Sequence, residues 1–478
     1  MSEDKFNLVF KEKKIHFIGI GGIGMSALAR YYFANRSVIS GSDKEESDLI
    51  DSLRNEGIKN IWTPHNKKNI ETIDPDYVIY STAVLPTNEE FIWANENKKN
   101  ILHRSDLLEQ TANAKKLISV SGTHGKTTTS AMISEILINN NLNPSVILGG
   151  ILISRDKNII IGNGDYFVVE ADESDKSFLK GSPEIAVITN IEPDHLENYQ
   201  GGFEEIKKSF LEFAKKSILK KGLVVCLQDK ETKEIINKNF DLKDPKLITY
   251  EIQGQCESAK LSAKHNPKSN SWDIYLFGDF KTSLKLNSPG EHNVLNALAA
   301  FGVGYLIGLP PEKIKESLEN YQGVKRRFQI LTKSKDITII DDYAHHPTEI
   351  KAAINAAKEL NPKRLIVILQ PHQPTRVRDL WDDFTAVLSK EDCPIFVTDI
   401  YIARGSEIKG ISSQKLVEEI SKPNVNYLPG DINQILESLK KIIKPGDLIL
   451  ILGAGNITNL GSKLLKFYER VASKSGNN

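Results

Sequence analysis

The feature that most constrains this chain is a short apolar segment followed by a tight loop and an amphipathic helix, repeated along most of its length. The segment KIHFIGI, from Lys14, precedes the helical pattern MSALARYYFAN, and KLISVS, from Lys116, precedes TTTSAMISEILI. Further strand candidates are DYFVVEAD, IAVITNI, GLVVCL, ITIIDDY, RLIVIL, PIFVTDI and DLILILG. Continuous apolar strands that alternate with helices are typical of parallel sheets covered on both faces. The sequence therefore predicts an α/β fold.

Length and pattern together predict three domains. The chain has 478 residues, and domains of ~150 residues are usual. A new strand–loop–helix unit starts after Ala114, and a second border falls near Gly323, before VKRRFQI. Between Lys246 and Leu286 the helical rhythm stops, and patterns such as WDIYLFGDF predict an antiparallel ribbon. We therefore expect domains at 1–112, 113–322 and 323–478.

Composition narrows the class of protein. Lys plus Arg and Asp plus Glu each total 62, so the formal net charge is zero, which argues against a nucleic-acid partner. The three cysteines, Cys226, Cys256 and Cys393, are too few and too scattered for a disulfide framework or a structural zinc site. The polar start MSEDKFNLVFKEKK lacks a signal-peptide core, and no apolar run approaches the ~20 residues of a membrane span. We expect a soluble protein of a reducing cytoplasm, with no membrane partner.

A first glycine loop follows the segment that starts at Lys14. Its glycines are Gly19, Gly21, Gly22 and Gly24, and Asp43 stands at the end of the next strand candidate, VISGSD. Glycines let a phosphate approach the backbone closely, and the helix amino terminus supplies N–H donors and positive potential. The loop alone suggests NAD. It predicts pyrophosphate binding, but it does not identify the nucleotide. The alternative that the loop is a glycine-rich turn without a ligand also stays open.

A second glycine loop follows KLISVS and consists of Gly122, Thr123, His124, Gly125, Lys126 and Thr127. It is not the full G-x-x-x-x-G-K-[ST] pattern, because Val120 occupies the place of the first glycine. The closing Gly-Lys-Thr is intact. Its backbone N–H groups suit phosphates, Lys126 suits the β and γ oxygens, and the Thr127 hydroxyl suits Mg²⁺. The alternative is a solvated lysine in a tight turn. The sequence favours an ATPase core.

Metal ligands are then expected at neighbouring strand ends. Glu170 closes YFVVE and precedes ADESD, and His195 follows IAVITNI. Hard oxygens with one imidazole suit Mg²⁺ that is held partly by substrate phosphates, rather than a zinc cage. Acidic residues after a strand are also often solvated turn residues. We take Glu170 and His195 as metal-ligand candidates, together with Thr127.

With those residues in place, the sequence resembles the Mur ligase family. The resemblance rests on HFIGIGGIGMSALA, SGTHGKTTT, EADESD, TNIEPDHLENY, GEHNVLNALAA, KRRFQ, DDYAHHPTEI, QPHQPTRVRDL and GDLILILGAG, in that order and spacing. It implies an amino-terminal Rossmann-like UDP-binding domain, a central P-loop ATPase domain and a carboxy-terminal Rossmann-like domain. It also implies ATP and Mg²⁺ as cofactors.

The resemblance also implies roles for individual residues. By it, the loop Gly19–Gly24 with Asp43 holds the UDP diphosphate rather than NAD. The implied ATP-binding set is Gly122, Thr123, His124, Gly125, Lys126, Thr127, Thr128, His292, Asn293, Asn296 and Arg327, with Thr127, Glu170 and His195 at the metal. The implied catalytic residues are Lys126, Arg327, Asp342, His345 and His346. The implied amino-acid-binding residues are Tyr343, His372, Arg376 and Arg378. Gln373 and Pro374 depart from the Arg-Tyr usual in the family after QPH.

The implied reaction joins L-alanine to the lactyl carboxylate of UDP-N-acetylmuramate in peptidoglycan precursor synthesis. A carboxylate acylates poorly, so ATP would convert it to an acyl phosphate, and ADP and phosphate would be released. Either His345 or His346 can take the proton of the amine, or merely orient the substrate. Three alternatives stay open: a sibling ligase for another amino acid or peptide, a nicotinamide dehydrogenase, and a non-enzymatic nucleotide switch. We expect a monomer or weak homodimer.

Overall fold

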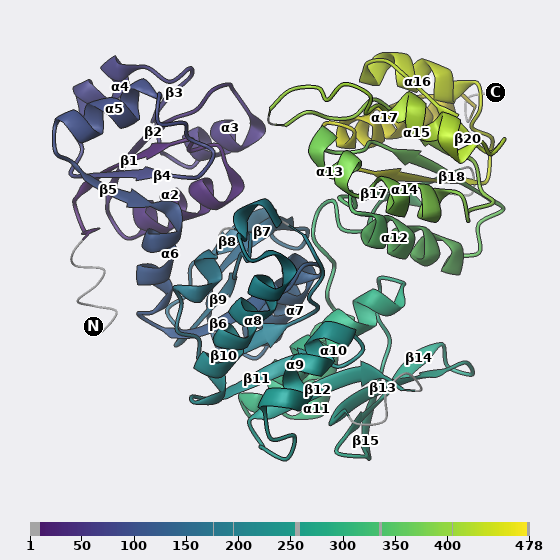
Figure 1. The fold of residues 1–478 in the computed structure, drawn as a ribbon, viewed down its shortest axis with the longest axis horizontal. Helices are drawn as coiled ribbons and strands as arrows, with labels where there is room; N and C mark the ends of the chain where they lie inside the picture. The colour runs from purple at the N-terminus through teal and green to yellow at the C-terminus, as the bar shows by residue number, and fades with distance from the viewer. Residues whose placement is uncertain are drawn as a thin grey trace. The chain divides into compact units, whose positions relative to one another are not determined.

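The computed structural model describes residues 10–174, 176–194, 196–253, 259–333, 337–403 and 405–475. In these ranges the strands form three sheets, each accompanied by helices (Figure 1). Contacts divide the chain into two compact units, Met1–Leu286 with Val294–Gln322 and Asn287–Asn293 with Gly323–Asn478. Among the helices so described, none is long and apolar enough to cross a membrane.

The first sheet is fully parallel, in the order β3-β2-β1-β4-β5. Ile15 and Phe17 pack on one face with Leu28, whereas Ile18 packs on the other face with Trp93. Both faces are therefore covered, as the continuous apolar strands predict. The strands are β1 (Lys14–Ile18), β2 (Val38–Ser42), β3 (Asn60–Trp62), β4 (Tyr77–Tyr80) and β5 (Asn100–His103), and the helices are α2 (Ile23–Ala34), α3 (Asp48–Asn55), α4 (Lys67–Ile73), α5 (Glu89–Glu96) and α6 (Arg104–Ala112).

The second sheet belongs to the same unit, in the order β15-β14-β13-β12-β11-β10-β6-β9-β7-β8. All neighbours from β13 to β7 are parallel, and β13–β14, β14–β15 and β7–β8 are antiparallel. The strands are β6 (Lys116–Ser121), β7 (Ser145–Leu152), β8 (Lys157–Ile160), β9 (Tyr166–Glu170), β10 (Ile185–Ile188), β11 (Gly222–Cys226), β12 (Leu247–Ile252), β13 (Leu261–Asn266), β14 (Ser271–Leu276) and β15 (Asp279–Leu284). The helices are α7 (Lys126–Asn139), α8 (Gly202–Ile218), α9 (Lys230–Asn239), α10 (Glu291–Leu306) and α11 (Pro311–Glu319).

The predicted antiparallel ribbon needs one correction. It is right for β13 to β15, but β12, at the start of the predicted range, pairs in parallel with β11. All six residues of β12 are buried, so this strand continues the covered parallel sheet. The ribbon proper begins only where polar residues alternate with apolar ones.

The first two sheets share one hydrophobic core. Ile147 of β7, Ile159 of β8 and Phe167 of β9 belong to the same buried cluster as Leu28 of α2. Asn158 on β8 donates from its Nδ2 to the carbonyl oxygen of Ile23, at 2.8 Å. The start of α2, and with it the first glycine loop, is therefore fixed against the second sheet.

The third sheet forms the other unit, in the order β16-β17-β21-β18-β19-β20, with only the edge strand β16 antiparallel. On β21, Leu450 faces α12, α14 and α15, whereas Ile451 faces α16 and α17. The strands are β16 (Gln329–Lys333), β17 (Ile337–Asp342), β18 (Arg364–Leu369), β19 (Ile395–Val397), β20 (Val425–Tyr427) and β21 (Asp447–Leu452). The helices are α12 (Pro347–Glu359), α13 (Pro374–Asp379), α14 (Trp381–Leu388), α15 (Ser413–Ile420), α16 (Ile432–Lys440) and α17 (Thr458–Ser475). The domain borders at residues 112 and 322 stay predictions.

A buried carboxylate ties together the polar face of the first sheet. Glu90 on α5 is fully buried and accepts a hydrogen bond from the Ser42 hydroxyl. It also accepts from the Asn66 backbone N–H at 3.1 Å, from Asn69 Nδ2 at 3.2 Å and from His16 Nε2 at 3.2 Å. Burial by itself raises the pKa of Glu90, but hydrogen bonds from His16 and from its other neighbours hold that pKa well below its usual value.

We expect Glu90→Gln to destabilise the protein at pH 7 by about 2 kcal/mol, because the new amide would turn an N–H toward buried donors. A carboxylate with a depressed folded pKa stabilises above its unfolded pKa of ~4.3, and this contribution is lost as the pH falls. The thermal midpoint should therefore drop by roughly 5 °C at pH 7, and the gap from wild type should shrink below pH ~4. Glu96→Gln, exposed on the same helix, is the control. An unchanged midpoint at pH 7 contradicts the prediction.

Candidate functional site

The first glycine loop leaves a helix amino terminus open to an anion. The carbonyl oxygen of Ser42 accepts from the N–H groups of Gly19 and Ile20, and Asp43 Oδ2 accepts from Gly21 N–H at 2.8 Å. A Cβ on Gly21 would lie 2.9 Å from that same oxygen, so a larger residue there would displace the Asp43 carboxylate. Gly22 caps α2 without a side chain, and the first turn holds no acidic residue. Asp43 thus holds the loop, and the first N–H groups of α2 suit a phosphate.

The second glycine loop is shaped by the end of β10. The Thr189 hydroxyl and Asn190 Nδ2 both donate to the His124 carbonyl oxygen, at 2.6 and 3.1 Å. The N–H of His124 donates to Asn190 Oδ1 at 2.8 Å. Gly122 has φ +135, and a Cβ there would lie 2.1 Å from Thr189 Oγ1, so the turn requires glycine. The neighbouring strand thereby fixes the loop backbone before any ligand binds.

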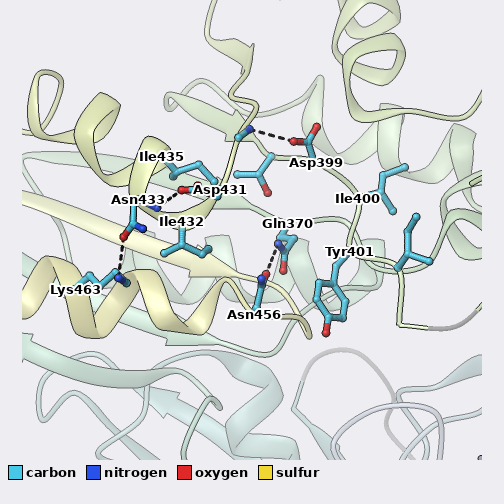
Figure 2. A pocket seen from close by; sticks show the side chains of 13 residues that line it. Gln370, Asp399, Ile400, Tyr401, Asp431, Ile432, Asn433, Ile435, Asn456 and Lys463 are labelled. Carbon is cyan, nitrogen blue, oxygen red and sulfur yellow. Dashed lines mark hydrogen bonds between the residues drawn. The ribbon is translucent and has the colours of Figure 1, made fainter. Parts of the chain in front are cut away.

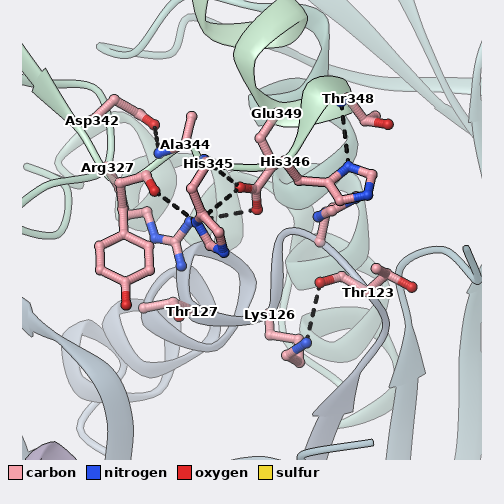
Figure 3. Close-up of polar contacts among 12 residues, drawn as sticks. Thr123, Lys126, Thr127, Arg327, Asp342, Ala344, His345, His346, Thr348 and Glu349 are labelled. Atoms are coloured by element: carbon pink, nitrogen blue, oxygen red, sulfur yellow. Dashed lines mark hydrogen bonds and ion pairs between the residues drawn. The ribbon is translucent and has the colours of Figure 1, made fainter. Parts of the chain in front are cut away.

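Lys126 already has three acceptors. Its Nζ donates to the carbonyl oxygen of Thr123 at 3.2 Å (Figure 3). It also donates to the carbonyl oxygen of Gly122 at 2.6 Å and to Glu173 Oε1 at 2.8 Å. Burial favours the neutral amine, but the carboxylates of Glu173 and Asp172 outweigh it and raise the pKa of Lys126. The ammonium therefore stays charged. Of its three acceptors only Glu173 is anionic, so Glu173 is the partner that a phosphate oxygen would replace.

Thr127 and Glu170 lie side by side, as a magnesium site requires. The Thr127 hydroxyl donates to Glu170 Oε2 at 3.0 Å, and Glu170 Oε1 accepts from Gly149 N–H at 2.5 Å. A hydroxyl and a carboxylate are hard oxygen donors of the kind Mg²⁺ prefers, so the donor set fits that ion. His195, the third predicted ligand, lies outside the described residues.

The predicted adenosine set is divided between the two units. Asn296 accepts from the Thr129 hydroxyl at 3.1 Å, and its Oδ1 would lie 2.5 Å from a Cβ on Gly125. It therefore lies against the second glycine loop, where Thr128 belongs to the first turn of α7. His292 and Asn293 belong to the other unit, in which Asn293 Nδ2 donates to the Pro289 carbonyl oxygen at 2.7 Å.

In the second unit, the end of β17 gathers most of the predicted catalytic residues (Figure 3). Asp342 accepts from the N–H groups of Phe328 at 2.6 Å and Ala344 at 2.7 Å. Burial raises the pKa of Asp342 to about 6, against the opposing charge of Arg327. The Arg327 guanidinium lies 5.0 Å from the Tyr343 ring centroid. The loop thus holds Arg327 beside a carboxylate and an aromatic ring, and Arg326 lies over the same ring at 4.8 Å.

His345 is held as a neutral imidazole of defined tautomer. Its Nδ1 lies 2.9 Å from the Tyr343 carbonyl oxygen, which only accepts, so Nδ1 carries the proton and Nε2 carries a lone pair. Burial lowers the pKa of His345 to about 4, although the Glu349 carboxylate opposes this and Arg376 reinforces it. His345 therefore presents an unprotonated nitrogen at neutral pH.

His346 has a different role from His345. Its Nδ1 accepts the N–H of Thr348 at 3.3 Å and so caps the amino terminus of α12. That lone pair is already used, and the proton of a neutral ring then lies on Nε2, which can only donate. Of the two histidines that the sequence left equivalent, His345 alone has the lone pair of its Nε2 available to accept a proton.

The predicted amino-acid-binding residues are brought together only in part. His372 lies 5.5 Å from His345 between ring centroids, and it stacks on Tyr401 at 5.7 Å. Arg376 lies near enough to influence His345. Arg378 instead is exposed and donates to its neighbour Asp379 at 2.7 Å. Where the family has Arg-Tyr, Gln373 donates its N–H to the Tyr401 carbonyl oxygen, and Pro374 is the first residue of α13.

A polar cavity of about 430 Å³ lies beyond Tyr401 in the same unit (Figure 2). Across it Gln370 Nε2 donates to Asn456 Oδ1 at 2.9 Å, and Lys463 Nζ donates to Asn433 Oδ1 at 2.8 Å. These bonds join the loops after β18 and β21 and the helices α16 and α17. Tyr401, which stacks on His372, lines the same cavity.

Sequence reasoning assigned no role to Glu173, Glu349 or Tyr401. Glu173 lies inside EADESD, three residues after Glu170, and Glu349 lies four residues after His345 in DDYAHHPTEI. Both therefore had a motif signal, although His345 precedes the cap of α12 and its approach to Glu349 is not a helix-face spacing. Tyr401 had none, because its contact with His372 joins two separate strand ends.

The comparisons with known proteins agree with this geometry. The model described as Mur ligase family, catalytic domain, matches residues 14–116, the Mur ligase middle domain matches 120–304, and the Mur ligase, glutamate ligase domain matches 326–455. The chain belongs to the Mur ligase family. The predicted three-domain α/β fold is confirmed, and the chain is an enzyme. This membership excludes two of the alternatives, a nicotinamide dehydrogenase and a non-enzymatic nucleotide switch. Neither of them accounted for all of the motifs.

Individual relatives show which members of the family this chain is similar to. The UDP-N-acetylmuramate–L-alanine ligase of Dictyoglomus turgidum is 41% identical over 461 residues, covering 95% of this chain and 96% of its own. The protein of the same name from Clostridium tetani is 40% identical, covering 95% and 98%. Among solved structures, the UDP-N-acetylmuramate-alanine ligase of Thermotoga maritima matches with a TM-score of 0.78 and 30% identity, covering 96% of this chain and all of its own.

We predict that Glu170→Gln removes the Mg²⁺ dependence of ATP binding, because an amide oxygen carries no charge to attract the ion. Equilibrium binding of ATP should be at least about tenfold tighter with Mg²⁺ than with EDTA for the wild type, and equal in both for the variant. Asp165→Asn removes an exposed carboxylate immediately before the same strand, and this variant should behave like the wild type. A variant that retains the Mg²⁺ effect contradicts the metal assignment.

Proposed function

We propose that this Mur ligase joins L-alanine to the lactyl carboxylate of UDP-N-acetylmuramate at the expense of ATP, through an acyl phosphate, with release of ADP and phosphate. One observation carries the proposal: relatives that bear this name match nearly the whole chain at about 40% identity. The geometry is compatible, because the first unit combines two glycine loops at the starts of α2 and α7.

The second glycine loop supplies charge to the transferred phosphoryl group. Lys126 is buried and charged, and it exchanges Glu173 for a phosphate oxygen without leaving the loop carbonyls of Gly122 and Thr123. Phosphoryl transfer needs mainly positioning and charge neutralisation. Thr127 and Glu170 would hold Mg²⁺, which when bound neutralises charge on the phosphate oxygens. We assign Arg327 the same task in the second unit.

His345 accepts the proton of the attacking amine. An amine must lose a proton as it attacks a carbonyl carbon, and Nε2 of His345 is unprotonated because Nδ1 donates to Tyr343. Its pKa of about 4 keeps it in this state at neutral pH. His372, which packs against His345, and Arg376 are placed to hold the amino acid, with the guanidinium on its carboxylate.

The cysteines bear on the compartment in which the protein works. Cys226 and Cys393 are free thiols in the described part of the chain, which is usual in a reducing cytoplasm. We therefore propose that the reaction takes place in the bacterial cytoplasm. A monomer or weak homodimer stays a prediction.

The function is tested by the release of ADP from the purified protein with UDP-N-acetylmuramate, ATP, Mg²⁺ and each amino acid in turn. We expect release with L-alanine well above that with every other amino acid or with a tripeptide. A clear preference for another amino acid, or for a preformed peptide, would assign the chain to a sibling activity of the family.

The acyl phosphate is tested with oxygen. The carboxylate attacks the γ-phosphoryl group and forms an acyl phosphate. The amine then displaces phosphate from the carbonyl carbon, and the phosphate leaves with the bridging oxygen that came from the carboxylate. UDP-N-acetylmuramate labelled with ¹⁸O in its carboxylate should therefore give ¹⁸O-phosphate, measured by mass spectrometry. Label in AMP, or product formation with unlabelled phosphate, would overturn the mechanism.

We expect His345→Asn to lower kcat by about 100-fold, because its amide still donates to the Tyr343 carbonyl but offers no acceptor at the Nε2 position. His346→Asn should cost less, since asparagine is also a good helix cap. Both variants are compared in kcat under saturating substrates and in thermal midpoint. A larger loss in the His346 variant, at equal stability, would reverse the assignment.

A further inference from the structure

The polar cavity of the second unit lies where an α/β sheet usually binds a small ligand. The adjacent parallel strands β21 and β18 send the chain to opposite faces of the sheet, since α17 after β21 packs with Ile451 and α14 after β18 packs with Leu450. In open α/β sheets, ligands bind in the crevice at such a point. Gln370 follows β18, Asn456 follows β21, and both line the cavity. Its volume of about 430 Å³ is within the ~300–1,000 Å³ of small-molecule pockets.

Tyr401 lies between this cavity and the residues that are proposed to hold the amino acid. Its ring stacks on the His372 ring, with 5.7 Å between the centroids and 16° between the ring planes. The other neighbour of His372 is His345, at 5.5 Å between centroids. Of these three described residues, only Tyr401 lines the cavity, beside the Gln370–Asn456 pair (Figure 2). The three rings therefore form a row that ends at the cavity.

The Tyr401 ring is held firmly in this position. Its N–H donates to the Pro371 carbonyl oxygen at 2.8 Å, and its own carbonyl oxygen accepts from the Gln373 N–H at 2.9 Å. Its backbone is thus paired with the segment on either side of His372. A Cβ on Gly455 would lie 2.5 Å from Tyr401 Cγ, so the glycine is what allows the ring to lie there. Side chains that are packed this closely resist displacement by a ligand.

We propose that Tyr401 is the wall that limits the amino-acid substrate to a small side chain, and that it closes off the cavity behind it. The inference rests on the proposed function, in which His345 takes the proton of the amine and Arg376 holds the carboxylate. With those two groups fixed, the side chain of the amino acid points toward His372 and Tyr401. A methyl group fits in front of the ring, whereas a longer side chain would need the space that the ring occupies.

The lining of the cavity determines which longer side chain is admitted once the ring is removed. Gln370 and Asn456 offer amide groups, joined by a hydrogen bond of 2.9 Å. Among the charged lining residues, the carboxylates of Asp399 and Asp431 outnumber the ammonium of Lys463. A long neutral amide such as glutamine therefore suits the cavity. Glutamate has nearly the same shape, but its charge is repelled by the carboxylates.

The test compares the wild type with Tyr401→Ala in kcat/KM for L-alanine, L-glutamine and L-glutamate, measured by ADP release with saturating UDP-N-acetylmuramate and ATP. We expect the ratio of L-glutamine to L-alanine to rise at least about tenfold in the variant, because excluding one methylene from a pocket is worth about 10- to 200-fold. The ratio of L-glutamate to L-alanine should rise clearly less. Tyr401→Phe, which retains the ring, should keep the wild-type ratios.

Ile432→Ala is the matched control, since it enlarges the same cavity from α16 and leaves the Tyr401 ring in place. It should leave the preference among amino acids unchanged. Wild-type ratios in a folded Tyr401→Ala would mean that Tyr401 does not select the substrate, and equal gains for L-glutamine and L-glutamate would place their side chains outside the cavity; either overturns the proposal. Thermal midpoints show whether the alanine variant is folded, and Tyr401→Leu, which shortens the wall but keeps apolar packing, carries the test if it is not. The proposed function fails separately, if the wild type makes no ADP with UDP-N-acetylmuramate and L-alanine.

Discussion

Hydrogen bonds between the parallel strands β9, β6 and β10 position Glu170 and Thr189 at the second glycine loop. In parallel strands the carboxyl ends meet at one edge, so Glu170 at the end of β9 reaches Thr127, and Thr189 after β10 fixes the backbone of His124. A loop of glycines is otherwise free to adopt many conformations, and ordering it on binding would cost affinity. Because the sheet orders the loop during folding, the loop does not have to be ordered when the ligand binds.

Burial then sets the charges that the chemistry uses. Lys126 stays protonated because the carboxylates of Glu173, Asp172 and Glu170 outweigh the cost of burial. His345 is neutral because burial outweighs its single carboxylate neighbour, Glu349. Both results come from the same competition between desolvation and nearby charge. A cation for phosphate and an unprotonated base for an amine can therefore coexist at one pH, provided that each has its own surroundings.

The first unit combines rigid support with unsatisfied donors. Beneath the first glycine loop the Glu90 carboxylate has four hydrogen-bond donors, so the end of β2 is firmly held. On the loop itself, the start of α2 has no side-chain cap, so its first N–H groups are left for a ligand. The contrast is physical: donors that lie in the core must be satisfied on folding, whereas donors at a ligand site are satisfied by the ligand.

The sequence by itself determined the fold class and the two glycine loops, because apolar periodicity and glycine spacing are local properties of the chain. It placed β1, β6 and α7 almost to the residue, and it named Thr127 with Glu170 and His345 with His346. It did not distinguish those two histidines, since the difference lies in whether Nδ1 meets a carbonyl oxygen or an N–H. It also missed Tyr401, whose partner His372 is distant in the chain. Tertiary structure decided these points, because burial and hydrogen-bond partners exist only once separate segments are packed together.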